Sequence, residues 1–591
     1  MSTPADDWIR PWSRPTRFSG LVFRLKAALL QAGRAGRNWR AGLLRLKQGN
    51  AAAFPILLGE SRSPLWSDAR EAEASYQRGK VQNLRRSTRA LDRILLPAGE
   101  VFSFWRQIGR ARRGRGYVTG RMLLQGCMVP AVGGGLCQLS NALYDAALQS
   151  GCEIIERHAH SRVIPGSSAQ AGRDATVAWN YIDLRFRSRR PLLIDARLGR
   201  DELVVRFRGP PGAGERATRP AGTDPQTVWP RPRARSCSTC ADTACHRHEG
   251  GQTIQSRGRT AYLVDEGWPE FQAYVRRAHR REDLLALPLD GRRWRMARYR
   301  WDTSEFAAIC TAPLETLARA LTARRLQAQG PARLMAQFAA AESLARRFSG
   351  MLSADVSEVC VAQSLLPYLW RDGHLGGRGF RVLMTRLPMG RIQSRLDAAW
   401  AKHPERASLR DFRAPDWLID AEAEALEAAE VIITPHEDIA RLFPNKALRL
   451  DWHMPDLPAL ARQGRAPRCI VFPGPTIARK GAYEIRAAAR DLDIEVVALG
   501  RALEEVDFWR GIRVRADLGG KGPRQWLRDV AAVVQPALIE DQPRRLLAAL
   551  AAGVPVIATA ACGIPAREGL MLVPAGDGAK LAAALRQILE A

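Results

Sequence analysis

Residues 131–160 read AVGGGLCQLSNALYDAALQSGCEIIERHAH, and this stretch decides how the N-terminal third of the chain folds. Gly133, Gly134 and Gly135 allow the backbone to approach a neighbour closely and to adopt conformations that other residues avoid. Cys137 follows them at the start of an amphipathic helical pattern, where unpaired N–H groups and the helix dipole favour a thiolate. The sequence therefore predicts a reactive cysteine at the start of a helix.

The segment that follows supplies histidines for this cysteine. In CEIIERHAHSRVI, residues 152–164, Glu156, His158 and His160 share one parity, so a continuous strand would point all three to the same face. A thiol nucleophile needs a nearby base, and the base needs an orienting partner. We expect His158 to be the base, with His160 as the alternative and Asp174 as the orienting carboxylate. The competing interpretation is a glycine-rich turn with a buried structural cysteine and a histidine pair that holds a loop together.

Four segments around this motif carry a family resemblance. They are KVQNLRRSTRALDRILLPAGEVFSFWRQIGR (80–110), GYVTGRMLLQGCMVPAVGGGLCQLSNALYDAAL (116–148), ERHAHS (156–161) and GRDATVAWNYIDLRFR (172–187). Together they resemble the VanW family, which is named from vancomycin-resistance gene clusters, over about residues 50–210. The resemblance implies an α+β domain with a role in the bacterial cell envelope.

Length and terminal sequence set limits on the class of protein. A chain of 591 residues is long enough for about three domains, each with its own core. It contains no apolar run long enough to span a membrane as a helix. The first residues, MSTPADDWIRPWSRPTRF, lack the pattern of a secretory signal peptide. We therefore expect a cytoplasmic protein, in which the ten cysteines are reduced thiols or metal ligands.

The net charge of +30 does not indicate nucleic-acid binding. Only eight of the 90 basic residues are lysines, and the arginines are spread over every segment. No helix-turn-helix, zinc-finger or RNP-type pattern accompanies them. We expect the partner to be an anionic surface or an anionic substrate. We do not expect it to be a nucleic acid.

Residues 1–49 form a basic segment with helical periodicity. Apolar and basic side chains alternate there at helical spacing, namely Leu21, Leu25, Ala28 and Leu29 with Arg24, Lys26 and Arg34. One interpretation is a helix that lies on an anionic membrane surface, which would make the protein peripheral at the inner face of the cytoplasmic membrane. The other is a helix packed on the neighbouring domain with its arginines in solvent.

Residues 211–258 have the composition of a linker and contain a short cluster of metal-ligating types. The stretch 211–236 is rich in Pro, Gly and Arg and has no periodicity. The cluster that follows consists of Cys237, Cys240, Cys245, His246 and His248. A C-x2-C pair completed by Cys245 and a histidine offers four ligands, and zinc is the simplest metal for them. The alternative is a loop with incidental thiols.

The last 330 or so residues alternate short apolar runs with helical patterns. Continuous Val, Ile and Leu runs between amphipathic helices are typical of parallel sheets covered on both faces. The alternation restarts after Pro455, which divides the region into residues 259–455 and 456–591. Two such halves in tandem predict two Rossmann-type domains with a cleft between them. The whole chain is thus expected to be a multidomain protein of mixed α+β and α/β class.

The second of these halves carries recognisable motifs. FPGPTIARKGAYEIRAAARDL (472–492) and IEDQPRRLLAALAAGVPVIAT (539–559) resemble the nucleotide-sugar-binding domain of GT-B glycosyltransferases, notably the retaining family 4 type. In such enzymes a lysine matched by Lys480 contacts the donor diphosphate. A glutamate matched by Glu540, the first of a Glu-x7-Glu motif, faces the donor sugar. The resemblance therefore implies a nucleotide-sugar donor and a catalytic role for Glu540.

Two positions depart from the family pattern. The second glutamate of the motif, which holds the ribose hydroxyls, falls at Ala548, and an arginine of the first loop is replaced by Pro475. Each lost hydrogen bond to a ligand hydroxyl costs about 1–3 kcal/mol. Either another residue substitutes, with Arg479 and Arg544 as the candidates, or the fold binds something else.

Two functional hypotheses follow from the sequence. In the first, the C-terminal half transfers a sugar from a nucleotide-sugar donor to an envelope glycan or a lipid-linked acceptor, beside a cysteine-dependent activity in the VanW-like domain. In the second, a non-catalytic VanW-like binding module is joined to a degenerate glycosyltransferase fold used for recognition or regulation. Ala548 favours the second hypothesis, and the fusion of two envelope-related patterns favours the first.

Overall fold

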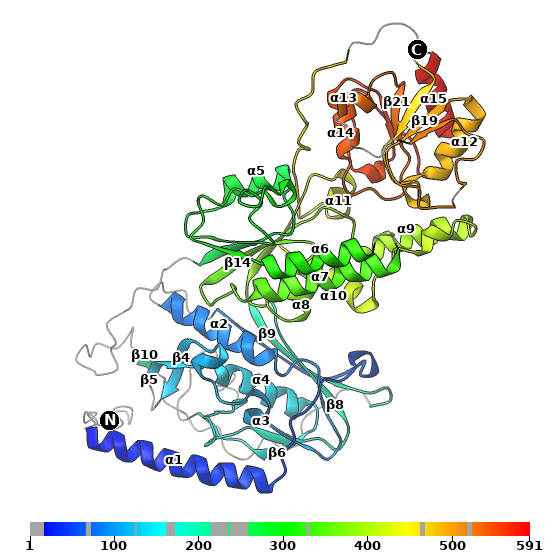
Figure 1. Cartoon of the computed structure of the whole chain (residues 1–591). Helices are drawn as coiled ribbons and strands as arrows, with labels where there is room; N and C mark the ends of the chain where they lie inside the picture. The colour runs from blue at the N-terminus through cyan, green and yellow to red at the C-terminus, as the bar shows by residue number, and fades with distance from the viewer. Residues whose placement is uncertain are drawn as a thin grey trace, which may run out of the picture. The chain divides into compact units, whose positions relative to one another are not determined.

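The computed structural model divides the chain into two compact units (Figure 1). The first comprises Met1–Gly258 with the short segments Ser353–Ser357 and Gly376–Arg378, and the second comprises the remaining residues. The structure describes residues 17–66, 73–124, 127–160, 172–213, 235–236, 258–326, 330–460, 467–505, 507–516 and 523–590.

Small antiparallel sheets and helices make up the first unit. The largest sheet has four strands in the order β1-β9-β8-β2, and three-stranded sheets β10-β5-β4 and β3-β7-β6 accompany it. The strands are β1 (Ile56–Pro64), β2 (Ile94–Leu96), β3 (Val101–Ser103), β4 (Thr119–Leu124), β5 (Cys127–Val132), β6 (Glu153–Glu156), β7 (Arg185–Arg187), β8 (Leu192–Leu198), β9 (Glu202–Gly209) and β10 (Arg235–Ser236). The helices are α1 (Arg17–Arg40), α2 (Ala74–Thr88), α3 (Phe104–Ile108) and α4 (Leu136–Gln149).

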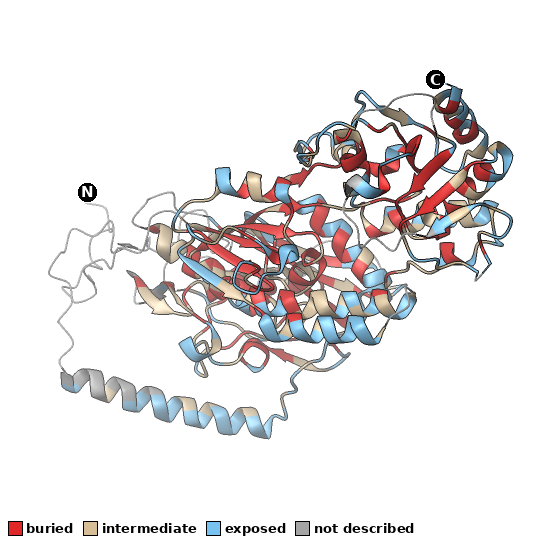
Figure 2. Ribbon diagram, turned by 45° about the horizontal axis from the view of Figure 1, so that its top comes forward, coloured by how far each residue is buried: buried red, intermediate tan, exposed pale blue. Residues whose placement is uncertain are grey.

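The core of the first unit lies where α4 packs on the four-stranded sheet. In α4, Leu136, Leu139, Leu143 and Ala147 recur at helical spacing and are all buried. The helix contacts β1 and β9, and α2 contacts β8 of the same sheet. Aromatic rings from the strands complete this core, among them Phe102 and Phe186, whose ring centroids are 4.5 Å apart. Figure 2 shows these buried strands and helices in red.

Helix α1 differs from the other helices of this unit in its exposure. Its described side chains are exposed or half-buried, as Figure 2 shows. Among the described residues, α1 included, no helix is both long enough and apolar enough to cross a membrane.

A seven-stranded sheet forms the first half of the second unit. Its strand order is β13-β12-β11-β14-β15-β16-β17, and the pairings from β14 to β17, like those from β11 to β13, are parallel. The strands are β11 (Arg259–Leu263), β12 (Leu284–Leu287), β13 (Ala308–Thr311), β14 (Val356–Ala362), β15 (Gly379–Leu383), β16 (Val431–Thr434) and β17 (Ala447–Arg449). The helices are α5 (Pro269–Ala278), α6 (Pro313–Arg325), α7 (Pro331–Ser349), α8 (Leu366–Arg371), α9 (Met389–Lys402), α10 (Asp416–Ala428) and α11 (Glu437–Leu442).

A six-stranded parallel sheet, in the order β20-β19-β18-β21-β22-β23, forms the second half. Its strands are β18 (Cys469–Phe472), β19 (Glu495–Ala498), β20 (Val514–Ala516), β21 (Ala532–Gln535), β22 (Val556–Ala558) and β23 (Leu570–Leu572), with helices α12 (Ala482–Leu492), α13 (Pro523–Trp526), α14 (Arg544–Ala551) and α15 (Gly578–Glu590). Every residue of β18, β21 and β22 is buried, as expected for strands covered on both faces. The predicted pair of Rossmann-like parallel sheets is confirmed.

Candidate active sites

The three glycines before Cys137 form a turn that packs backbone against backbone. Gly133 and Gly135 have φ angles of 79° and 99°, which glycine adopts readily and other residues avoid. Between them, a Cβ on Gly134 would lie only 2.4 Å from the carbonyl carbon of Gly120 in β4. In turn, a Cβ on Gly79 of α2 would lie 2.0 Å from the Thr119 carbonyl oxygen. The turn, β4 and α2 are therefore in contact through positions that only glycine can fill.

The side chain of Asn83, in α2, holds the glycine turn in place through hydrogen bonds. Its side chain is fully buried, and its amide nitrogen donates to the carbonyl oxygens of Val118 and Gly134, each at 2.9 Å. Its amide oxygen accepts from the Val118 backbone N–H, also at 2.9 Å. These three bonds fix the distance between Val118, just before β4, and the glycine turn. The position of Cys137 follows from that arrangement.

Cys137 is the second residue of α4. The helix begins at Leu136, with Gly135 as its N-terminal cap, so the Cys137 N–H lies among the unpaired donors of the first turn. The half-buried thiol has two hydrogen-bond partners, the His160 ring and the backbone N–H of Val177. Both contacts favour the thiolate over the thiol.

Asp174 orients the His160 ring. The carboxylate oxygen Oδ2 of Asp174 lies 2.8 Å from both Nδ1 and the backbone N–H of His160. With Nδ1 engaged in this way, Nε2 is the ring nitrogen left for the hydrogen bond with Cys137. Arg157 holds the other carboxylate oxygen of Asp174, with its Nη2 at 3.0 Å from Oδ1. Asp174 is itself fully buried, so this chain of contacts fixes the base in one orientation.

The electrostatics of the pair favour an ionised thiol. Burial by itself would raise the pKa of Cys137, but the hydrogen bond and the charge of His160 and the Val177 N–H lower it below the ordinary value of a thiol. Burial would lower the pKa of His160, but its bonds to Asp174 and Cys137 raise it to about 9. The arrangement therefore favours a thiolate–imidazolium pair over a neutral thiol and imidazole.

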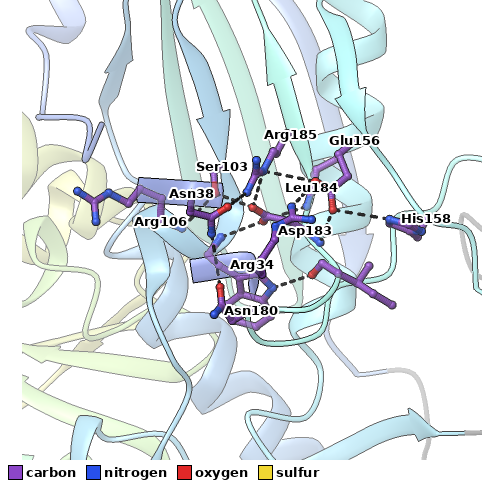
Figure 3. Close-up of polar contacts among 12 residues, drawn as sticks. Arg34, Asn38, Ser103, Arg106, Glu156, His158, Asn180, Asp183, Leu184 and Arg185 are labelled. Carbon is purple, nitrogen blue, oxygen red and sulfur yellow. Dashed lines mark hydrogen bonds and ion pairs between the residues drawn. The ribbon is translucent and has the colours of Figure 1, made fainter. Parts of the chain in front are cut away.

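His158 does not lie at the thiol. Its side chain is half-exposed, and its Nε2 lies 3.6 Å from the Glu156 carboxylate, as Figure 3 shows. The expectation that His158 is the base rested on a continuous strand through residue 160, whereas β6 ends at Glu156. Because the chain leaves the strand there, the alternation of side chains no longer applies, and His160, the alternative, is the histidine that contacts Cys137.

In the second unit, Lys480 and Glu540 form a buried ion pair. Lys480 follows β18, in the turn before α12, and Glu540 follows β21, the adjacent strand. The ammonium of Lys480 donates to the Glu540 carboxylate at 3.1 Å and to the Ile539 carbonyl oxygen at 2.9 Å. Both side chains are largely buried. The two residues matched to donor-binding positions thus meet at the carboxyl ends of neighbouring parallel strands, which is where ligands bind in such sheets.

Glu540 is held in its ionised form. Burial would raise its pKa, but Lys480, the Gln542 backbone N–H and the Gln535 side chain together lower it. The Gln542 N–H donates at 2.9 Å to Oε1 of Glu540. The Gln535 amide donates to Oε2, the oxygen that also accepts from Lys480. The neighbouring carboxyl group, Asp541, has its pKa raised by burial. The site therefore presents one fixed carboxylate that can accept hydrogen bonds from a ligand hydroxyl.

Arg544, one candidate to replace the missing donor contacts, has another structural role. Its guanidinium makes two bonds to Glu270 of α5, at 2.6 and 2.7 Å. It also lies over the rings of Trp268 and Trp452, with centroid distances of 4.9 and 5.4 Å. Arg544 therefore joins α14 to α5 and to the segment after β17.

The two residues that depart from the family pattern, Ala548 and Pro475, both pack against neighbouring protein atoms. Ala548 is buried on α14 within the hydrophobic core, where a carboxylate would have no solvent. Pro475 is in close contact with Gly500, where a Cβ would lie 2.5 Å from the Pro475 Cα. Arg479 precedes Lys480, and burial lowers its pKa, although the charges of Asp541 and Asp411 act in the opposite direction. Arg479 is thus the remaining cationic candidate beside Lys480.

His436 is a site residue that the sequence analysis did not single out. It precedes α11, and its Nε2 donates to the Glu540 carbonyl oxygen at 3.0 Å. A Cβ on Gly563 would lie 2.3 Å from this ring, so the loop after β22 packs flat against it. No spacing rule could have found this contact, because the two partners are 104 residues apart.

A cavity of about 410 Å³ lies close to this site. Leu538, two residues before Glu540, lines it together with the loops that follow β22 and β23. Its other wall is mainly basic and comes from Arg395, Lys402, His403 and Arg406, with Asp438 and Glu484 beside them. Arg395 pairs with Asp438 at 2.8 Å and Arg406 with Glu484 at 2.7 Å.

The Cys/His cluster expected to bind zinc lies outside the described residues. It comprises Cys237, Cys240, Cys245, His246 and His248. Within the part of the chain that the structure describes, no group of three or more His, Cys, Asp or Glu side chains is arranged to hold a metal ion.

Two segments of the chain match known protein families, one in each unit. Residues 79–208 match the family described as VanW like protein, and residues 471–591 match the family described as glycosyl transferases group 1. The chain carries a VanW domain and a group 1 glycosyltransferase domain. Both resemblances drawn from the sequence are thereby confirmed, and the Cys137 and His160 pair lies in the VanW domain.

Two curated relatives match the VanW domain. They are the uncharacterized protein YoaR of Bacillus subtilis, 34% identical over 133 residues, and the vancomycin B-type resistance protein VanW of Enterococcus faecalis, 34% identical over 140 residues. The matches cover 22% and 23% of this chain. They span 43% and 50% of the length of the two relatives, so the similarity is confined to part of each protein.

Solved glycosyltransferase structures are similar to part of the chain. Sucrose-phosphate synthase from Thermosynechococcus elongatus is 15% identical with a TM-score of 0.37, and Anabaena HepE in complex with UDP and glucose is 14% identical with a TM-score of 0.33. Each alignment covers 56% of this chain and 90% of the other chain.

Proposed function

We propose that the second unit is a glycosyltransferase that moves a sugar from a nucleoside diphosphate sugar to an envelope glycan or a lipid-linked acceptor. The observation that carries the proposal is the buried pair of Lys480 and Glu540 at the carboxyl ends of β18 and β21. It combines a cation for phosphate with a carboxylate for sugar hydroxyls. The match of this region to group 1 glycosyltransferases supports the same assignment.

Lys480 and Arg479 are the residues that would hold the diphosphate. Both follow β18, and each carries a positive charge that the donor's phosphates would neutralise. In the present arrangement the Lys480 ammonium neutralises Glu540. A bound diphosphate would share that ammonium, while Gln535 and the Gln542 N–H keep Glu540 ionised. Developing negative charge on the leaving diphosphate is then stabilised by preorganised cations.

Glu540 would position the donor sugar. Its carboxylate is fixed by three donors and is largely buried, so it can accept hydroxyl bonds without paying to become ordered. Retention of configuration at the sugar is proposed on the family 4 resemblance. The acceptor class is proposed from the VanW domain, since one relative is named for vancomycin resistance, and peptidoglycan or its lipid-linked precursor is the acceptor we favour. Such a donor is used in the cytoplasm, and we propose that location for the protein.

Donor binding tests this function. The full-length protein should be stabilised against heat by at least one nucleoside diphosphate sugar from a panel of UDP, GDP, ADP and dTDP sugars. Lys480→Met should weaken that binding by about tenfold or more, because a charge-assisted contact to phosphate is lost. Isothermal titration calorimetry measures the change.

Lys580→Met is the matched control, because Lys580 is an exposed lysine of α15 in the same domain. It should leave the Kd unchanged. If no nucleoside diphosphate or nucleotide sugar binds the wild-type protein, the transferase assignment is wrong, and the buried Ala548 supports a fold kept for recognition.

A second function is favoured by the Cys137, His160 and Asp174 arrangement. We infer that the VanW domain carries out cysteine-dependent acyl transfer on a substrate with an ester, thioester or amide carbonyl. The Cys137 thiolate would attack the carbonyl carbon, and the bond to the leaving group would break to give a thioester. The protonated His160 would give its proton to the leaving group, and Asp174 would keep the ring in the required orientation.

Alkylation kinetics test the reactive thiol. The rate of Cys137 modification by iodoacetamide, followed by peptide mass spectrometry, should persist below the pH at which an ordinary thiol of pKa about 8.5 loses reactivity. The sign follows from the lowered Cys137 pKa, because the thiolate is lost only as the pH falls through that lower value. His160→Gln should slow the reaction at pH 7 by about tenfold.

His158→Gln is the matched control for this experiment. His158 is two residues away and half-exposed, and its described partner is Glu156. The control should alkylate at the wild-type rate. Equal rates for wild type and His160→Gln across the pH range would show that the imidazole does not activate the thiol.

A further inference from the structure

Helix α1 contacts the VanW domain through its polar side. Arg34 forms an ion pair with Glu156 of β6, and the Asn38 amide nitrogen lies 3.4 Å from the Asn180 amide oxygen. Arg185 of β7 donates to the other end of the Asn38 amide, and Asn180 donates to the backbone carbonyl of Gln31. Figure 3 shows Arg34 and Asn38 of the helix beside Glu156, Asn180 and Arg185.

The apolar side of the same helix faces away from these contacts. Phe18, Leu25 and Leu29 are spaced by seven and four residues, so they lie along one stripe of the helix. Their exposed fractions are 75%, 57% and 73%, and that of Trp39, near the end of the helix, is 83%. An amphipathic helix of a soluble domain normally does the reverse and buries its apolar stripe. Phe18, Leu25, Leu29 and Trp39 are therefore mostly exposed, and none of them belongs to the hydrophobic core of the described residues.

The charge around the apolar stripe has one sign. No acidic residue occurs between Asp7 and Glu60, a stretch that contains the whole of α1. The exposed basic residues of α1 and of the segment after it are Lys26, Arg37, Arg40, Arg45 and Lys47. A surface that combines exposed aromatic and aliphatic side chains with cations and no anions complements an anionic lipid headgroup layer.

We propose that α1 docks the VanW-domain unit on an anionic lipid bilayer. Phe18, Leu25, Leu29 and Trp39 enter the boundary between headgroups and acyl chains, and Lys26, Arg37 and Arg40 bind lipid phosphates. The polar contacts of Arg34 and Asn38 keep the opposite side of the helix on the domain. A second copy of the chain is disfavoured as the occupant, because two such basic surfaces repel each other and each chain carries a net charge of +30.

The docked helix has a consequence for the thiol site. Glu156, which binds Arg34, directly precedes Arg157, which binds Asp174. Two consecutive residues thus connect the helix and the orienting carboxylate of His160.

Vesicle co-sedimentation of the full-length protein tests the docking. Vesicles of phosphatidylcholine and phosphatidylglycerol in equal parts should bind the wild type, vesicles of phosphatidylcholine alone should bind it far more weakly, and added salt should weaken the anionic binding. Leu25→Ser/Leu29→Ser/Trp39→Ser should reduce partition by about tenfold or more, because three apolar groups that would enter the bilayer are lost. Lys26→Gln/Arg37→Gln/Arg40→Gln should reduce it to a similar extent.

Leu314→Ser/Leu317→Ser provides the matched control. These leucines lie on α6 of the second unit, 77% and 57% exposed, with Arg319, Arg324 and Arg325 on the same helix. The control should bind as the wild type does. The alkylation rate of Cys137 in each variant reports that the VanW domain remains folded.

Three results would overturn the proposal. The first is a wild-type protein that does not bind anionic vesicles, and the second is an α1 apolar variant that binds them as well as the wild type. The third is a lipid-free dimer in analytical ultracentrifugation that the α1 apolar variant converts to a monomer, since the stripe would then be an interface between copies.

Discussion

Cys137 and Cys152 lie at opposite ends of α4, and their thiols are in opposite electrostatic environments. Burial raises the pKa of Cys152 to about 12, and the nearby Arg190 and Ser188 do not offset it. Cys137 is also desolvated, but His160 and the Val177 N–H outweigh that effect and lower its pKa. The opposite pKa shifts of the two thiols therefore follow from their hydrogen-bond partners and not from residue type or burial.

Asn83 is the residue on which the geometry of this site depends most directly. Replacing it with alanine leaves the Val118 N–H and the Gly134 carbonyl without this partner beside a fully buried position, whereas the Val118 carbonyl keeps its bond from the Gly133 N–H. We expect Asn83→Ala to lower the free energy of unfolding of the VanW domain by about 2–4 kcal/mol. Urea unfolding followed by circular dichroism, analysed for the transition of this unit, measures the loss.

Asn50→Ala is the comparison for this variant. Asn50 is exposed in the same unit, and its side chain accepts one bond, from the Ala52 N–H at 3.1 Å. Its replacement should cost about 1 kcal/mol or less. Equal losses for the two variants would mean that the buried Asn83 network contributes nothing beyond a local cap.

At the scale of elements, periodic segments were predictable from the sequence and element ends were not. The pattern of α4 and the apolar runs of β18, β21 and β22 are found in the structure where the sequence placed them. The strand expected to carry His158 and His160 stops at Glu156, because Arg157 turns away to bind Asp174 and the Gly172 carbonyl. The competing contact is with residues 15 and 17 positions later, which no local pattern reports.

Helix α1 shows the same limit in another form. Its amphipathic and basic character was evident from the sequence, but the side that faces the domain was not. Arg34 and Asn38 find their partners 122 and 142 to 147 residues later, at Glu156, Asn180 and Arg185. Tertiary contacts of this kind turn the polar side inward, contrary to the usual rule for surface helices.

In the candidate sites, too, some residues were predictable from the sequence and others were not. Cys137, Lys480 and Glu540 belong to short motifs, and the sequence identified them for that reason. Glu270 binds Arg544 over a separation of 274 residues, so its role required the folded chain. Motifs thus indicate the candidate site residues, whereas the residues that hold them in place come from distant segments.

At the scale of the whole molecule, each candidate site is built within a single compact unit. Cys137, His160 and Asp174 belong to the first unit, and Lys480 and Glu540 belong to the second. Each unit has its own hydrophobic core, so neither site needs residues of the other for its geometry. The two candidate sites therefore share no side chains.

Independent sites should respond independently to substitution. We expect Cys137→Ser to leave the Kd for the nucleotide-sugar donor within about twofold of wild type, because substitutions without shared partners are nearly additive in free energy. Lys480→Met should likewise leave the alkylation rate of Cys137 within about twofold. Calorimetry and peptide mass spectrometry on the same preparations measure both quantities. A change of about tenfold in either direction would show that the two units are energetically coupled, since such a change corresponds to about 1.4 kcal/mol transmitted between them.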